Sequence, residues 1–264
     1  MKLIKVAVNG ALGRVGREVV KAVCREPGME VVGAIEAEVN EKFLPLPDGS
    51  GLVPFADDLG YILTETKPNV VVDFTNAHVA LMTARLAAQN GVNLVIGTTG
   101  LAPDEIGEIE RLTEAHKIGA VVAPNFALGA VLLIHLAKIA AQYFDSAEIV
   151  ELHHNQKADS PSGTALATAR AMAAARGKPF SLSDEQKKAS DSRGKRVEQI
   201  NIHSVRLPGL MAHQEVLLGG PGQTLSLRHD TINRECYMPG VILAIKKVVK
   251  HPGLIYGLDT LLGL

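Results

Sequence analysis

The residues best suited to chemistry lie together in one short stretch of the chain. Two adjacent histidines, His153 and His154, are followed closely by Lys157, and all three come after an apolar run predicted to be a strand. Three such polar side chains cannot all be buried without partners. Histidine and lysine are also among the side chains that transfer protons in enzymes. The spacing therefore predicts an acid/base group at the end of this strand.

The residues that follow add a group able to hold an anion. Residues 160–164 read Ser-Pro-Ser-Gly-Thr and open an alanine-rich helix predicted over residues 165–176. Unpaired N–H groups at a helix start, together with the hydroxyls of Ser162 and Thr164, suit a carboxylate. Read from these residues alone, a solvated strand end followed by a helix cap is an alternative that involves no chemistry.

A glycine-rich turn near the N-terminus indicates a second site. A strand predicted over residues 4–9 runs into Gly10-Ala11-Leu12-Gly13-Arg14-Val15-Gly16, and a helix is predicted over residues 14–25. Glycines at this spacing let the backbone approach a pyrophosphate, which the helix N-terminus also attracts. Glu36 ends the second predicted strand, 20 residues after Gly16, where a carboxylate can accept hydrogen bonds from ribose hydroxyls. We expect a dinucleotide-binding site here.

The residue after Glu36 bears on the choice of nucleotide. A carboxylate repels a 2′-phosphate, and the next residue is Ala37 rather than an arginine that could bind one. This predicts NADH as the preferred cofactor and NADPH as the second one. Arg14, inside the glycine turn, is a charge that could still reach a phosphate.

A second small-residue turn reads Gly97-Thr98-Thr99-Gly100 and follows a strand predicted over residues 93–96. Ligands bind at the carboxyl end of the strands in open parallel sheets, and small residues there let a flat nicotinamide approach. A turn with glycine caps and no ligand is equally compatible with these four residues.

These motifs together make the chain recognisable. The pattern H-H-x-x-K-x-D-x-P-S-G-T-A, over residues 153–165, resembles the signature of the dihydrodipicolinate reductase family. The resemblance covers the whole chain, and its other marks occur in order. They are the glycine turn at 10–16, Asp73-Phe74-Thr75, the turn at 97–100, Ala123-Pro124-Asn125-Phe126, and Arg206, Gly209, His213, Glu215, His229, Arg234 and Gly240.

The resemblance implies a role for each matching residue. His153 matches the acid/base histidine of the family, and Lys157 matches the lysine that donates a proton or holds the substrate. Substrate carboxylates would be held by His154, Ser162, Gly163 and Thr164. The cofactor contacts would be Gly10, Ala11, Leu12, Gly13, Arg14, Val15, Gly16, Glu36, Gly97, Thr98, Thr99, Ala123, Pro124, Asn125, Phe126 and Arg234.

The resemblance also implies a reaction, the NAD(P)H-dependent reduction of 4-hydroxy-tetrahydrodipicolinate in lysine and diaminopimelate biosynthesis. The substrate would be a small cyclic dicarboxylate, and the enzyme a homotetramer. The sequence departs from the family pattern at Ala37, where some members carry an arginine, and at His78, near which a proline is usual. Two alternatives are another two-domain dehydrogenase, acting on an amino acid or a sugar, and a non-catalytic NAD sensor.

The order of the predicted elements indicates how these residues are positioned. Apolar strands at 4–9, 30–35, 70–74, 93–96 and 120–123 are separated by helices at 14–25, 77–89 and 104–116, with a loop at 43–54. This predicts a Rossmann-type, doubly wound parallel sheet. A helix at 128–143, strands at 148–153, 197–207, 215–218 and 224–229, and a polar, mobile loop at 181–195 predict a second, α+β part with a mostly antiparallel sheet.

We therefore expect a dinucleotide-binding domain over residues 1–126 and a substrate-binding and oligomerisation domain over residues 127–239. A helix predicted from 240 to 250, with the tail to 264, should pack back on the first domain.

Composition narrows the class of protein. Apolar residues make up 47% of the 264 residues, so a packed core is expected. The net charge of −1 does not resemble that of a nucleic-acid binder. No apolar run is long enough to span a membrane, and neither cysteine has a metal-binding spacing. These features predict a cytoplasmic protein with two reduced thiols, no metal, and no nucleic-acid or membrane partner.

Overall fold

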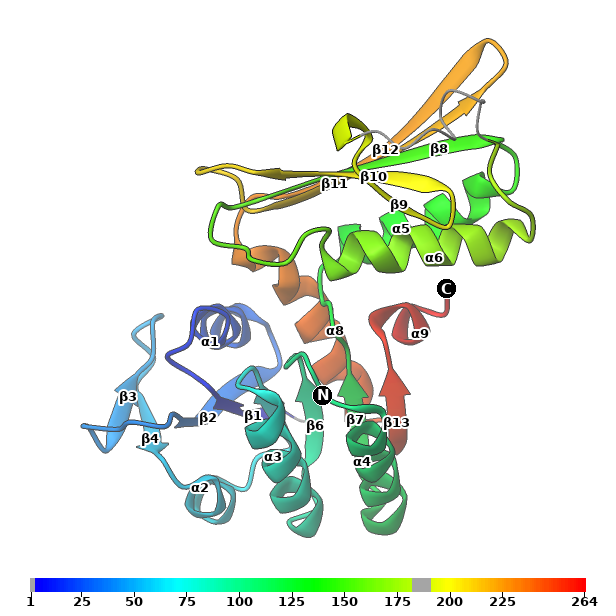
Figure 1. Cartoon of the computed structure of the whole chain (residues 1–264). Coiled ribbons are helices and arrows are strands. Elements are labelled where there is room, and N and C mark those ends of the chain that lie inside the picture. The colour runs from blue at the N-terminus through cyan, green and yellow to red at the C-terminus, as the bar shows by residue number, and fades with distance from the viewer. Residues whose placement is uncertain (1–2, 182–190) are drawn as a thin grey trace. The chain divides into compact units, whose positions relative to one another are not determined.

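The computed structural model describes residues 3–181 and 191–264, which form two compact units (Figure 1). Unit 1 combines two separate segments, Met1–Leu128 and Arg234–Leu264. Unit 2 is the continuous segment between them, Gly129–Asn233. The chain therefore leaves unit 1 once and returns to it.

Unit 1 is built on a sheet with the strand order β13-β7-β6-β5-β1-β2-β4-β3. Every pair in this order is parallel except β3–β4. The central strands are apolar throughout, as in Val6–Val8 and Val70–Val72, because helices cover both faces. The strands are β1 Ile4–Asn9, β2 Met29–Ile35, β3 Phe43–Pro45, β4 Leu52–Ala56, β5 Val70–Asp73, β6 Asn93–Ile96, β7 Gly119–Val122 and β13 Gly253–Tyr256.

The helices of unit 1 lie on the two faces of this sheet. Helices α1, Gly16–Arg25, and α8, Met238–Val248, contact each other on one face. The other face packs against α2 Leu59–Thr66, α3 Ala77–Gln89 and α4 Pro103–His116 (Figure 1). A short helix, α9 Leu258–Leu262, follows β13. The predicted Rossmann-type doubly wound sheet is confirmed.

One local prediction for unit 1 is wrong. Residues 43–54 were expected to form a loop, but β3 and the first part of β4 pair there as an antiparallel hairpin. Proline lacks an N–H but is tolerated in an edge strand, so Pro45 of β3 does not prevent the pairing. Pro54 of β4 comes before the two residues of β4 that pair with β2. Asp48 stabilises the turn by accepting a hydrogen bond from the Ser50 amide at 3.0 Å.

Unit 2 has a five-stranded sheet, order β12-β11-β8-β10-β9, in which only the β8–β10 pair is parallel. The mostly antiparallel sheet is thus confirmed. Its strands are β8 Ser146–His153, β9 Lys195–Val197, β10 Ile200–Arg206, β11 Ala212–Gly220 and β12 Gln223–Thr231. The single strand predicted over 197–207 is two strands, because Glu198 and Gln199 form a tight turn with positive φ.

Helices α5, Leu128–Ala141, and α6, Gly163–Arg176, cover one face of the unit 2 sheet (Figure 1). Their buried side chains pack on alternate strand residues such as Ile149, Ile202 and Val216. Two short 3-10 helices complete the chain, η1 Asp191–Arg193 and η2 Arg234–Tyr237. Most of the predicted mobile loop at 181–195 lies outside the described residues.

Over residues 3–181 and 191–264, no helix combines the length and apolar character needed to cross a membrane. In the same residues, no cluster of three or more His, Cys, Asp or Glu side chains is arranged to hold a metal ion.

Candidate active site

The glycine turn lies between β1 and α1, as the sequence predicts. The amide of Gly13 donates to the Gly10 carbonyl at 3.0 Å, which closes the turn. A Cβ atom on Gly16 would lie 1.9 Å from the same carbonyl oxygen, so this position excludes a side chain. No side chain caps the first turn of α1. A tight turn that leads into an uncapped helix start fits the pyrophosphate of a dinucleotide.

Glu36 lies at the end of β2, in contact with the glycine turn. Its Oε2 accepts a hydrogen bond from the Leu12 amide at 2.9 Å, and its Oε1 accepts one from the Ala37 amide at 3.3 Å. A cavity of about 440 Å³ opens beside it, with Asp57 and Asp58 also on its wall. Three carboxylates at one cavity suit free ribose hydroxyls better than a phosphate.

Arg14 is exposed on the glycine turn. Arg234, another predicted cofactor contact, is half-buried at the start of η2 in the same unit.

A buried carboxylate connects the ends of the strands that lie next to the turn at residues 97–100. Asp73 is fully buried, and its Oδ2 accepts hydrogen bonds from Asn9 at 3.0 Å and Thr83 at 2.7 Å. Its Oδ1 accepts from the hydroxyls of Thr75 at 2.7 Å and Thr98 at 2.8 Å. These bonds fix Thr98, a predicted cofactor contact, to the ends of β1 and β5. Asn9 and Thr83 belong to none of the sequence motifs, although both contact this carboxylate.

The remaining predicted cofactor residues in unit 1 gather around two aromatic rings. A Cβ atom on Gly97 would lie 2.1 Å from the Phe74 ring, so that ring occupies the space beside the turn. Phe74 in turn packs against Phe126 with ring centroids 5.8 Å apart. The amide of Ala123 donates to the Ile96 carbonyl at 3.1 Å, which places residues 123–126 beside the turn at 97–100. Thr99 is exposed there.

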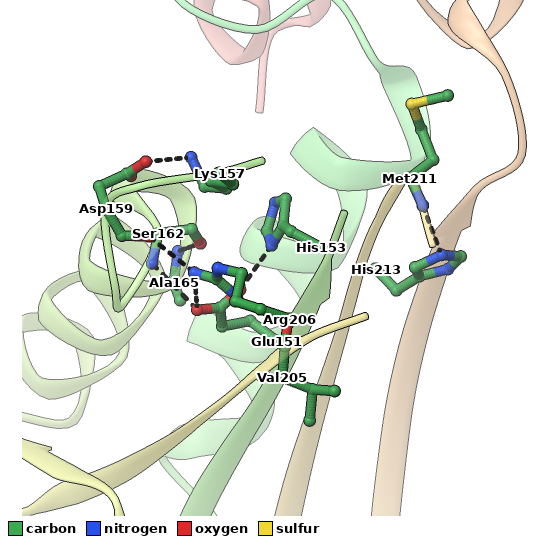
Figure 2. Close-up of polar contacts among 10 residues, drawn as sticks. All are labelled: Glu151, His153, Lys157, Asp159, Ser162, Ala165, Val205, Arg206, Met211 and His213. Atoms are coloured by element: carbon green, nitrogen blue, oxygen red, sulfur yellow. Dashed lines mark hydrogen bonds and ion pairs between the residues drawn. The ribbon is translucent and has the colours of Figure 1, made fainter. Parts of the chain in front are cut away.

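The predicted acid/base residues belong to unit 2, where His153 ends β8 (Figure 2). Its Nδ1 lies 2.5 Å from Oε2 of Glu151, and its side chain is 14% exposed. Glu151 is fully buried and also forms a two-pronged ion pair with Arg206 of β10, at 2.8 and 2.9 Å. Burial would raise the pKa of Glu151, but the hydrogen bonds from His153 and Arg206 outweigh it and lower the pKa to about 2. Glu151 is therefore an anion at neutral pH.

Lys157 and His154 follow in the loop after β8. The Lys157 ammonium group lies 2.7 Å from Oδ1 of Asp159, and its side chain is 23% exposed. His154 is partly buried, and its Nδ1 has no hydrogen-bond partner among the described residues. A buried nitrogen without a partner is costly unless something else binds it. That fits a residue whose partner is a ligand.

The predicted anion-binding residues form the start of α6, which begins two residues earlier than expected, at Gly163. Ser162 is buried and caps the helix, because its hydroxyl accepts a hydrogen bond from the Ala165 amide at 3.2 Å. Its own amide donates to Glu151 at 3.2 Å. Gly163 is exposed and Thr164 half-exposed, so their amides and the Thr164 hydroxyl are the accessible part of this helix start.

Comparison with known proteins agrees with this geometry. Residues 4–126 match the family described as "Dihydrodipicolinate reductase, N-terminus", and residues 129–262 match "Dihydrodipicolinate reductase, C-terminus". The chain is 53% identical to a 4-hydroxy-tetrahydrodipicolinate reductase of Dehalococcoides mccartyi, over 100% of both chains. It is 48% identical to the enzyme of the same name from Moorella thermoacetica, over 98% of each chain.

A similar solved structure also belongs to a dihydrodipicolinate reductase. It is titled as a dipicolinate-bound dihydrodipicolinate reductase from Paenisporosarcina sp. TG-14. The TM-score is 0.86 and the identity 40%, over 97% of this chain and 98% of that one. Matches of this extent decide against an amino-acid or sugar dehydrogenase that shares only the nucleotide-binding fold. Sequence, site and comparisons all assign this chain to the dihydrodipicolinate reductase family.

Proposed function

We propose that this chain reduces 4-hydroxy-tetrahydrodipicolinate to tetrahydrodipicolinate, a step of lysine and diaminopimelate biosynthesis. The observation that carries the proposal is His153, held by the buried Glu151 anion next to the helix start at Gly163 and Thr164. This arrangement combines a proton-transferring group with donors for a carboxylate, which a dianionic substrate requires. Full-length similarity to reductases of this name supports the same substrate.

In this proposal, unit 1 binds the nicotinamide nucleotide. The glycine turn and the start of α1 hold the pyrophosphate, Glu36 holds the ribose hydroxyls, and Thr98 lies at the carboxyl ends of the strands. Bound there, the nicotinamide would supply a hydride to ring carbon 4 of the substrate, once the 4-hydroxyl has left as water together with a proton from ring carbon 3. Fixed donors in the protein orient the cofactor, while the hydride chemistry belongs to the cofactor itself.

Unit 2 would bind the substrate and supply the proton. Reduction at ring carbon 4 leaves an enamine that must be protonated at ring carbon 3, and we assign this proton to His153 and Lys157. His154, Gly163 and Thr164 would hold the two carboxylates, with Ser162 keeping the helix start in place. Charge-assisted hydrogen bonds of this kind are stronger than neutral ones, and a dianion can accept several of them.

A flat dicarboxylate should compete with the substrate. Dipicolinate carries two carboxylates on a planar ring and is bound in the related Paenisporosarcina structure. We expect it to inhibit this enzyme competitively with the substrate, and Thr164→Val to weaken the inhibition by about 10-fold, because a hydrogen bond to a charged group is lost. Steady-state inhibition patterns against each reactant provide the measurement. Competition with the nucleotide alone would contradict the placement of the carboxylates at α6.

The preferred nucleotide should be NADH. Glu36, Asp57 and Asp58 border one cavity, and no guanidinium follows Glu36, so we expect kcat/KM to favour NADH by about 10-fold over NADPH. Ala37→Arg should raise the use of NADPH by placing a fork of donors opposite the 2′-phosphate. Nucleotide oxidation with freshly prepared substrate measures both, and it also tests the proposed reaction. If the parent prefers NADPH several-fold, Arg14 is the charge to replace next.

The proposal extends to assembly and location. We propose a homotetramer formed through unit 2, supported by the exposed apolar Val205 and Leu207 at the end of β10 and by the open sheet edges. We also propose a cytoplasmic location, where the nicotinamide nucleotides are regenerated. Unit 1 would be the dinucleotide-binding domain and unit 2 the substrate-binding domain.

A further inference from the structure

One buried anion connects the acid/base histidine to the anion-binding helix start. The Glu151 carboxylate accepts hydrogen bonds from His153 and Arg206 at Oε2, and from Arg206 and the Ser162 amide at Oε1. The Ser204 side chain is a further donor to it. We call Glu151, His153, Ser162 and Arg206 the Glu151 cluster (Figure 2).

Arg206 extends the cluster beyond the carboxylate. Its Nη2 also donates to the Asp159 carbonyl at 2.7 Å, in the loop that carries Lys157. Its Nη1 also donates to the Val205 carbonyl at 2.8 Å. The cluster therefore joins β8, β10, the loop after β8 and the first residue before α6. The proposed substrate-binding and acid/base residues lie at the end of β8, in the loop after it and around the start of α6.

The bond to Glu151 decides which nitrogen of His153 carries a proton. A carboxylate that lies 2.5 Å from Nδ1 accepts the proton of that nitrogen, so the neutral ring has its lone pair on Nε2. Nε2 is then the nitrogen that exchanges a proton with the substrate. A glutamine in place of Glu151 could present an amide N–H to the ring and reverse this tautomer.

The other charges near His153 are accounted for by partners of their own. Lys157 is paired with Asp159, and His213 of the neighbouring β11 lies 2.6 Å from Asp230. Glu151 is thus the anion that contacts the His153 ring in the described part of the chain, and Arg206 neutralises its remaining charge.

We infer that Glu151, held by Arg206, is the positioning residue of the reductase reaction: it sets the tautomer of His153 and fixes the start of α6 against it. This inference rests on the proposed function for the identity of the reaction. The structural contacts that it uses do not depend on the substrate.

A second cluster on the same strand offers a matched control. Glu148 of β8 lies 2.7 Å from Nε2 of His203 and pairs with Arg193, so it is also a glutamate between a histidine and an arginine. Its side chain is 28% exposed, whereas that of Glu151 is fully buried. None of the proposed site residues belongs to this second cluster.

The test compares Glu151→Gln, Glu151→Asp, Arg206→Lys and the control Glu148→Gln over a range of pH. In Glu151→Gln, we expect kcat to fall about 100-fold, as expected for a misplaced acid/base group. The pH–rate profile should have a limb that His153→Gln removes, and Glu151→Gln should move this limb, because the His153 ring loses the anion that contacts it. Glu151→Asp should keep this limb in place and recover part of kcat.

Arg206→Lys tests whether the geometry of the Arg206 side chain matters in addition to its charge, and Glu148→Gln is the control. Arg206→Lys should raise the KM for the substrate several-fold while the limb stays in place, since a lysine cannot replace the two-pronged bond but keeps the charge. Glu148→Gln should leave the pH–rate profile unchanged. NADH binding, followed by fluorescence, should be the same in all four variants.

The tautomer of His153 can also be measured in the absence of substrate, so this test does not depend on which reaction the enzyme catalyses. Nitrogen chemical shifts of labelled His153 should show the Nδ1–H tautomer in the parent and a shift towards Nε2–H in Glu151→Gln. If the parent shows no reductase activity but has this tautomer, the proposed function fails, while the inference that Glu151 sets the tautomer of His153 stands. A parent with the Nε2–H tautomer, or an active Glu151→Gln with an unmoved limb, overturns the inference.

Discussion

Replacing His153 with glutamine is expected to lower kcat by about 100-fold. Glutamine keeps a polar group of similar reach but cannot exchange a proton near neutral pH, and the loss of an acid/base group typically costs 10²–10⁴-fold. The glycine turn proposed to bind the nucleotide belongs to unit 1 and His153 to unit 2, so NADH binding should be unchanged. Steady-state kinetics and NADH fluorescence titration measure the two effects separately.

The matched control for this experiment is His203→Gln. His203 lies 2.7 Å from Glu148 in the same sheet, so it has the same type of partner as His153. The control should keep kcat within about twofold of the parent, in line with the small effects of most substitutions away from a site. A His153→Gln variant that is as active as His203→Gln would remove His153 from the mechanism.

A valine at Gly16 is expected to weaken nucleotide binding by at least about 100-fold. Its Cβ atom would lie 1.9 Å from the Gly10 carbonyl oxygen, so the turn must open by more than 1 Å before the side chain fits. Displacements of about 1 Å at a binding site can cost 10²-fold in rate, and here the displaced atoms are the ones proposed to hold the pyrophosphate. NADH fluorescence titration and thermal unfolding measure the effect.

Gly107→Val provides the control for this substitution. Gly107 lies inside α4, and a Cβ atom there would meet only the end of the Arg111 side chain at 3.5 Å. Valine forms helices better than glycine, so stability should be unchanged or slightly higher. NADH binding should match the parent. Equal affinities in the Gly16→Val and Gly107→Val variants would show that the turn at 10–16 does not hold the nucleotide.

The sequence predicts those parts of the fold where one local pattern dominates. The helix over residues 77–89 was predicted with the bounds that the structure shows, because Asn76 caps its start and Asn90-Gly91 ends it. Helix α2 and strand β13 were not predicted. α2 has eight residues and ends in a left-handed lysine, Lys67, rather than a glycine. β13 is a four-residue edge strand that pairs only with β7, a partner more than 130 residues away in sequence.

The sequence likewise predicts some parts of the candidate site and not others. The motifs at 10–16 and 153–165 were visible because their residues are adjacent in sequence. The bonds that position them are long-range: Asn9 reaches Asp73, Thr98 reaches the same carboxylate, and Glu151 pairs with Arg206 from another strand. Only the sheet registers bring these residues together. The sequence signal that could have identified Asp73 is a carboxylate placed directly after three buried valines.

The interrupted chain path of unit 1 has a consequence for synthesis on the ribosome. Helix α8, which covers one face of the sheet beside α1, and β13, which completes its edge beyond β7, both belong to the returning segment. At about 5–20 residues per second, the ribosome needs roughly 7–27 s to proceed from Leu128 through the end of that segment. Throughout this time, the β7 edge and the face that α8 will cover are open to solvent, while unit 2 emerges as one continuous piece. Unit 2 can therefore fold before unit 1 has all of its segments.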